Sequence, residues 1–147
     1  MAASTIASRA VDGSVQHQIE RIIYLFFRYL DDQRYDDLAA LFAPDGIWHR
    51  AGKALRGPKG VMEAMAHRPV GFTTRHLITN VVIDAADANE VIASYYMTVF
   101  VHEGTERPKE PVPLQWPLHV SVFEQKFSRS AAGWLIQGLS GVPTFHR

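Results

Sequence analysis

The sequence predicts an α+β fold, in which a curved, mostly antiparallel sheet wraps around N-terminal helices and encloses a pocket. Apolar residues recur at helical spacing early in the chain, whereas long alternating segments rich in β-branched residues follow later. Helices followed by antiparallel-looking strands are typical of α+β proteins. A sheet curved around a long helix leaves a conical cavity, and such cavities suit small apolar molecules.

Three helices are expected before the long strands. The first, about residues 15–32, places apolar residues at helical spacing opposite polar ones. The second, about residues 35–42, is expected to stop before Pro44 and the Asp45–Gly46 turn. The third opens at Gly57–Pro58, because proline is favoured in the first turn of a helix. The apolar stripe of the first helix consists of Ile19, Ile22, Ile23, Phe26 and Leu30.

Strands are expected to fill the rest of the chain. Residues 103–117 are the exception, because they hold four of the eight prolines and several charges, which favours a loop or an irregular edge. In the strand at residues 90–102 both alternating faces carry apolar side chains. The expected strands span about residues 47–49, 53–56, 73–84, 90–102, 118–128 and 134–141.

The composition limits the class of protein. With 147 residues, one domain is expected at residues 15–147, after a flexible tail at residues 1–14. A formal net charge of zero argues against nucleic-acid binding. No apolar run is long enough to span a membrane. The absence of cysteine removes disulfides, thiolate catalysis and zinc–thiolate sites, and it fits a cytoplasmic location best.

Asp31, near the end of the first helix, and His76, in an alternating strand, form the candidate catalytic pair. A carboxylate that meets an imidazole in an apolar cavity selects its tautomer and stabilises the protonated ring, which makes a general base. Each residue also has a structural interpretation, Asp31 as a helix-end acid and His76 as a satisfied strand residue. If the fold brings the two together, an enzyme is favoured over a scaffold.

Seven further residues are candidates for substrate binding. Asn80 is expected to share a strand face with His76, an unusual pair for a plain apolar core. His102 and His119 lie on later strands, although exposure at an edge or a bond to a neighbouring strand also accounts for them. Large aromatic side chains line cavities but more often build cores. The candidates are Tyr24, Phe27, Trp48, Asn80, Tyr96, His102 and His119.

The sequence carries no motif for a cofactor or a metal. Its seven histidines show no H-x-H, H-E-x-x-H or two-histidine-one-carboxylate spacing. No glycine-rich loop follows a strand to hold a phosphate, and no G-x-S-x-G supplies a nucleophile. We therefore expect acid–base chemistry without cofactor or metal, or binding without chemistry.

Five segments together resemble a SnoaL-like domain of the nuclear-transport-factor-like superfamily: I-E-R-I-I-Y-L-F-F-R-Y-L-D, Y-D-D-L-A-A-L-F-A-P-D-G-I-W, G-P-K-G-V-M-E-A-M, T-R-H-L-I-T-N and G-W-L-I. The resemblance covers about residues 16–141 and implies the cone-shaped α+β fold. The sequence is most similar to the scytalone dehydratase and hexachlorocyclohexane dehydrochlorinase type, in which an Asp–His dyad is the base. Asp31 and His76 match that dyad, and His102 approximately matches a further histidine. The tyrosines of that type are poorly reproduced, and Phe26 occupies the place of a first-helix tyrosine found in related bile-acid dehydratases.

The resemblance implies a cofactor-independent lyase, or an isomerase, acting on a small apolar cyclic substrate. His76 would remove a proton made acidic by a nearby carbonyl, and Asp31 would hold the ring. His102, Tyr24 or Asn80 would polarise the substrate or protonate the leaving group. Two alternatives stay open. One is a small-ligand-binding module without catalysis, and the other is a structural β-subunit of a ring-hydroxylating dioxygenase.

Self-association is also expected. The strand at residues 90–102 is apolar on both faces, and the helices cover only one of them, so a lone cone would leave an apolar patch in water. Two sheets packed back to back in a homodimer would remove this patch, with a trimer as the second possibility. No nucleic-acid or membrane partner is expected.

Overall fold

The computed structural model of the chain describes residues 11–147. Most of the expected tail, residues 1–10, lies outside the described residues, and residues 13 and 14 already belong to the first helix. Nine elements follow one another: α1 (Gly13–Asp31), α2 (Tyr35–Ala40), β1 (Phe42–Arg50), β2 (Lys53–Arg56), α3 (Gly57–Met65), β3 (Thr73–Ala86), β4 (Glu90–His102), β5 (His119–Ser130) and β6 (Gly133–His146).

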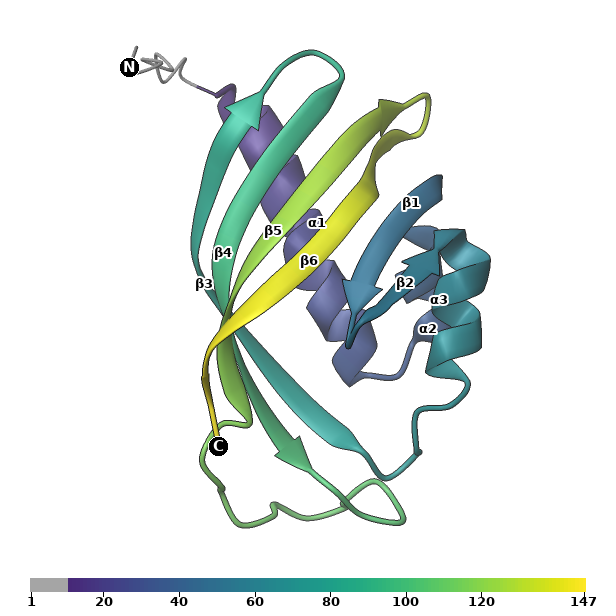
Figure 1. Ribbon diagram of the computed structural model, residues 1–147, viewed down its shortest axis with the longest axis vertical. Helices are drawn as coiled ribbons and strands as arrows, with labels where there is room; N and C mark the ends of the chain where they lie inside the picture. Colours follow the sequence, from purple (N-terminus) through teal and green to yellow (C-terminus); the bar gives the residue numbers. More distant parts are fainter. Residues whose placement is uncertain (1–10) are drawn as a thin grey trace.

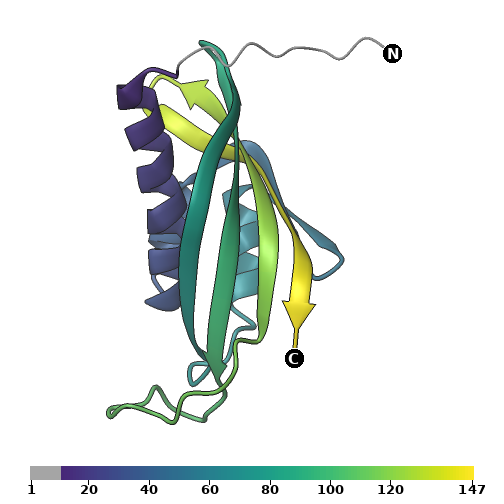
Figure 2. The ribbon, with the colours of Figure 1, turned by 90° about the vertical axis from the view of Figure 1, so that its left-hand side faces the viewer.

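One curved, unclosed sheet of six strands forms the main layer, in the order β2-β1-β6-β5-β4-β3. β1 runs parallel to β6, and every other neighbouring pair is antiparallel. Figure 1 shows α1 crossing the sheet, with α2 and α3 beside β1 and β2. Figure 2 shows α1 running along one side of β3 and β4. The predicted α+β fold is therefore confirmed.

The sequence of α1 explains both its start and its buried face. The side chain of Asp12 accepts a hydrogen bond from the backbone N–H of Ser14 and so caps the first turn. The buried residues recur every three or four positions, which turns one face of the helix toward the sheet. Asp31 closes this face, one turn after Phe27. The buried residues are Ile19, Ile23, Phe26, Phe27, Leu30 and Asp31.

β1 begins earlier than the sequence predicts, because the chain is already extended at Phe42, before Pro44. Its parallel partner β6 explains the difference. The register of the pair shifts between Phe42 and Ile47, and Pro44 lies in this irregular stretch, where a missing N–H is tolerated. A Cβ at Gly46 would collide with the carbonyl oxygen of Ile136 on β6, so glycine is needed for the close approach.

A bulge in β3 corrects the predicted strand faces. Asn80 has a positive φ of 55°, a conformation that asparagine adopts more readily than most residues. The register between β3 and β4 shifts between Thr79 and Val82 at the same place. The alternation therefore reverses, so that Val81 packs against the core while Asn80 and Val82, expected on the face of His76, are exposed.

The alternation predicted for β4 is confirmed, with Val91, Ala93, Tyr95, Met97 and Val99 buried. The opposite sheet face, which we call the outer face, carries large exposed apolar side chains from all four long strands. β6 continues to His146, past its predicted end at residue 141, and pairs with the start of β5. Within residues 11–147, none of the helices has the length and hydropathy needed to cross a membrane. The exposed outer-face residues are Leu77, Val82, Tyr96, Val122, Val142 and Phe145.

Candidate active site

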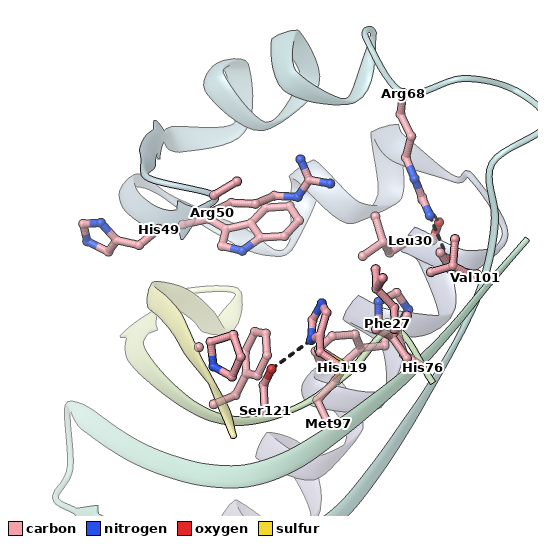
Figure 3. Close-up of a pocket in the computed structure, with 18 of the residues that line it drawn as sticks. Phe27, Leu30, His49, Arg50, Arg68, His76, Met97, Val101, His119 and Ser121 are labelled. Carbon is pink, nitrogen blue, oxygen red and sulfur yellow. Dashed lines mark hydrogen bonds between the residues drawn. The ribbon is translucent and has the colours of Figure 1, made fainter. Parts of the chain in front are cut away.

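A cavity of about 540 Å³ lies between α1, β1 and the inner faces of β3 to β6 (Figure 3). Its wall is mainly apolar, and a few polar side chains interrupt it, the arrangement expected of a small-molecule site. The apolar lining residues include Phe27, Leu30, Trp48, Met97, Val99, Val101, Leu118 and Phe123. The polar ones are His49, Arg50, Arg68, Thr74, His76, His119 and Ser121.

The fold brings Asp31 and His76 together at the wall of this cavity. The ring nitrogen Nδ1 of His76 lies 2.6 Å from Oδ1 of Asp31, and the two side chains are only 9% and 8% exposed. The backbone N–H of His76 donates to Oδ2 of the same carboxylate at 2.9 Å. Phe27 packs beside the imidazole, with ring centroids 5.1 Å apart. The carboxylate of Asp31 therefore contacts both the ring and the backbone N–H of His76.

Two residues that the sequence analysis did not name as site residues hold Asp31 in place. The hydroxyl of Thr74 donates to Oδ1 of Asp31 at 2.7 Å. Arg68 donates to the oxygen of that hydroxyl at 2.7 Å and to the backbone carbonyl of Leu30 at 2.7 Å. Because the guanidinium can only donate, the proton of the Thr74 hydroxyl must point toward Asp31. Thr74 could have been found from the sequence, because it lies two residues before His76 and therefore on the same strand face. Arg68 could not, because it lies in a connection where no helical or strand pattern places its side chain.

These donors decide the charge of Asp31. Burial acts to raise the pKa of the carboxyl group, but the hydrogen bond and charge of the His76 ring, the Thr74 hydroxyl and the His76 backbone N–H together hold it below its ordinary value. Asp31 is therefore a carboxylate at neutral pH, and a carboxylate only accepts hydrogen bonds. The proton of a neutral His76 ring must then sit on Nδ1, which leaves Nε2 with a free electron pair. Such an imidazole can accept a proton at Nε2.

A second histidine lines the same cavity from β5. Nδ1 of His119 lies 2.9 Å from the hydroxyl oxygen of Ser121, two residues along the same strand face. Burial lowers the pKa of His119, and the charges of His76 and His146 lower it further. His119 is therefore an uncharged imidazole at neutral pH.

The predicted substrate-binding residues divide into two groups. Phe27, Trp48 and His119 line the cavity. Tyr24 does not, because it points outward from α1 and is 47% exposed. Tyr96 is 49% exposed on the outer face of the sheet.

The other two predicted residues also lie outside the cavity. Asn80 is displaced by the bulge in β3. His102 ends β4 beside a separate hollow formed with residues 104–113. Four of the seven predicted substrate-binding residues, Tyr24, Asn80, Tyr96 and His102, therefore do not line this cavity.

Metal ligands do not cluster in the part of the chain that the structure describes. No group of three or more His, Cys, Asp or Glu side chains there is placed to hold a metal ion. The residues that line the cavity instead supply the imidazoles of His49, His76 and His119 and the guanidinium groups of Arg50 and Arg68, and Asp31 adds a carboxylate bonded to His76. These groups can move a proton, donate hydrogen bonds and attract negative charge.

Sequence comparison defines the class of protein. The model of the SnoaL-like domain family matches residues 14–140, so the chain belongs to this family. The resemblance expected from the sequence is thus confirmed. No curated protein matches the chain in sequence.

Solved structures share the same fold. The hexachlorocyclohexane dehydrochlorinase LinA-type3 from Novosphingobium barchaimii superposes with a TM-score of 0.74 at 16% identity, over 91% of this chain and 89% of that one. Aln2 from a Streptomyces species gives 0.73 at 18% identity, over 90% and 93%. An NTF2-like protein with a cystatin-like fold from Novosphingobium aromaticivorans gives 0.72 at 16%, over 89% and 82%. At these identities the likeness concerns the fold.

Proposed function

We propose that this protein is a cofactor-independent lyase or isomerase that removes a proton from carbon in a small, largely apolar cyclic substrate. The observation that carries the proposal is the contact of 2.6 Å between Asp31 and His76, a residue that lines a mainly apolar cavity. The similarity in fold to a hexachlorocyclohexane dehydrochlorinase, an enzyme named for an elimination, agrees with it.

His76 is the base in this proposal. Its Nε2 takes the proton from the substrate, and the imidazolium that forms is stabilised by the carboxylate of Asp31. The hydrogen bonds from Thr74 and Arg68 keep that carboxylate in position, so it does not have to reorganise as the charge appears. A base positioned in this way accelerates proton transfer by about 10²–10⁴-fold. In a lyase the electron pair of the broken C–H bond then expels the leaving group, and in an isomerase the proton returns at another carbon.

The proposal can be tested without knowledge of the natural substrate. The probe 5-nitrobenzisoxazole is a flat, apolar bicyclic molecule that opens when a base removes its C–H proton. The electrons of that bond form a nitrile, the N–O bond breaks, and a coloured phenolate is released. We expect the protein to release the phenolate faster than buffer does, and we expect His76→Ala to reduce the rate to that of the buffer.

His102→Ala is the matched control, because it also removes an imidazole but at a position outside the cavity. Its rate should equal that of the unchanged protein. A protein that is no faster than buffer, or a His76→Ala variant that keeps the full rate, would contradict the proposed base. Tight binding of the probe without turnover would favour a binding module.

A further inference from the structure

His119 faces the same cavity as His76 but from a different strand. In Figure 3 its ring is bonded to Ser121 through one nitrogen, and its other nitrogen points away from Ser121 into the space that the lining side chains surround. Within the described residues no protein group bonds that second nitrogen, Nε2. The role of His119 therefore depends on whether Nε2 carries a proton.

Ser121 decides this question. Its side chain is buried, with the residue only 2% exposed, and its hydroxyl has one hydrogen-bond partner among the described residues, Nδ1 of His119. If Nδ1 donated to the hydroxyl oxygen, the hydroxyl proton would have no acceptor among the described protein groups, and a buried group would lose a hydrogen bond. If the hydroxyl donates to Nδ1 instead, both groups are satisfied. The second arrangement places the ring proton of His119 on Nε2, directed into the cavity.

His76 and His119 thus have opposite tautomers. Asp31 requires the proton of His76 on Nδ1, so the Nε2 of that ring is an acceptor. Ser121 keeps the proton of His119 on Nε2, so this nitrogen is a donor. The lowered pKa of His119 keeps the ring neutral, and a neutral imidazole is a hydrogen-bond donor that does not readily lose its proton.

We propose that the Nε2–H of His119 donates a hydrogen bond to the substrate oxygen that becomes negative while His76 removes the proton. This inference rests on the proposed function, and it requires the kind of substrate that the family resemblance implies, one whose acidic C–H lies beside a carbonyl group. The electrons of the C–H bond form a carbon–carbon double bond, and the π electrons of the carbonyl move to oxygen. The substrate becomes an enolate with one negative charge, His76 becomes an imidazolium, and His119 keeps its proton.

Nitrogen NMR of the protein with ¹⁵N-labelled histidine tests the tautomers directly, at a pH at which both rings are neutral. We expect the proton of His119 on Nε2 and that of His76 on Nδ1. In Ser121→Ala we expect His119 to become a mixture of tautomers, while His76 stays unchanged. A proton on Nδ1 of His119 in the unchanged protein would overturn this inference. A proton on Nε2 of His76 would instead overturn the proposed base, so the two failures are distinguishable.

Kinetics with two probes tests the catalytic role. The oxygen released from unsubstituted benzisoxazole is more basic than the oxygen released from the 5-nitro compound, so it gains more from a hydrogen-bond donor. We expect His119→Ala to lower kcat by about 100-fold for the unsubstituted probe and by about tenfold for the nitro probe. His119→Gln should recover part of the loss, because its amide N–H₂ reaches toward the place of Nε2.

If His119 had a purely structural role, His119→Ala would lower kcat for both probes by the same factor. This result would overturn the inference, as would an unchanged kcat. Ser121→Ala provides a second variant if His119→Ala does not fold. Ser121→Ala keeps the imidazole of His119 but no longer fixes which ring nitrogen carries the proton. The decrease in kcat should therefore again be larger for the unsubstituted probe. Loss of activity in His76→Ala together with full activity in both His119→Ala and Ser121→Ala would leave the proposed function standing without this donor.

Discussion

Asp31→Asn is the most informative single change, because the geometry of the carboxylate dictates how the amide must sit. Oδ2 accepts a hydrogen bond from the backbone N–H of His76, which cannot reverse its role, so the amide oxygen must take this place. The amide N–H₂ then replaces Oδ1 and faces Nδ1 of His76 and the hydroxyl of Thr74. To accept from the amide, Nδ1 must lose its proton, so the proton of His76 moves to Nε2.

The expected magnitude follows from this reversal. With Nε2 protonated, the ring is no longer a base, and the corresponding change in the serine-protease triad lowers kcat by about 10⁴-fold. We expect a loss of about 10²–10⁴-fold with 5-nitrobenzisoxazole. Stability changes less, because the three hydrogen bonds to the carboxylate are replaced by weaker ones to a neutral amide, at a net cost of about 2 kcal/mol. For a chain of this length that cost lowers Tm by about 6 °C.

Three measurements examine this reasoning together: nitrogen NMR for the tautomer of His76, initial rates with the probe, and thermal unfolding. The combination expected is a proton moved to Nε2, a large loss of rate and a small loss of Tm. A variant that retains the proton on Nδ1, or one that retains the full rate with a reversed tautomer, would refute the argument. Thr74→Ser, which keeps the hydroxyl, is the control and should leave the tautomer unchanged.

Four further predictions follow from the same features. Thr74→Val keeps the shape of the side chain but removes the link from Arg68 to Asp31, so the free energy of unfolding should fall by about 1–3 kcal/mol in urea titrations; an unchanged value would show that this bond contributes nothing. Because the pKa of Asp31 is lower in the folded protein than the ordinary value of 3.8, its stabilising contribution is present at neutral pH and is lost as the pH falls below about 5. The difference in the free energy of unfolding between the unchanged protein and Asp31→Asn should therefore decrease toward acid pH. A difference that stays constant would contradict the lowered pKa of Asp31. Activity should survive prolonged chelation, whereas a loss restored by one added divalent ion would direct attention to the cavity histidines. The outer face of the sheet, where Tyr96 and Phe145 are exposed, should be covered by a second copy of the chain. Sedimentation equilibrium should therefore give a dimer, and a single species of 16.5 kDa would contradict this prediction.

Elements with a regular pattern could be predicted from the sequence alone. α1 and β4 were predicted nearly to the residue, because side chains recur every three to four positions on a helix and alternate along a strand. The sequence also provided Asp31 and His76 as a candidate pair, and the fold brings their side chains within 2.6 Å of each other. Phe27, Trp48 and His119, also selected from the sequence, line the cavity.

Features that depend on pairing between distant segments could not be predicted from the sequence. The early start of β1 follows from its parallel partner β6, and the bulge at Asn80 follows from the register with β4. The local pattern contains neither partner, so Asn80 was placed on the wrong face. Tyr24 and Tyr96 were selected by residue type, which does not say whether a side chain meets a cavity or solvent.

The polar contacts around Asp31 and His119 likewise depend on the folded chain. Arg68 lies outside any helix or strand, and only the fold brings its guanidinium to Thr74 and, through it, to Asp31. Likewise, the burial of Ser121 makes its hydroxyl select the tautomer of His119. A hydrogen bond depends on distances of a few tenths of an ångström between groups far apart in sequence. Periodicity can place a residue on a face, but only the packed chain determines which group lies within reach of it.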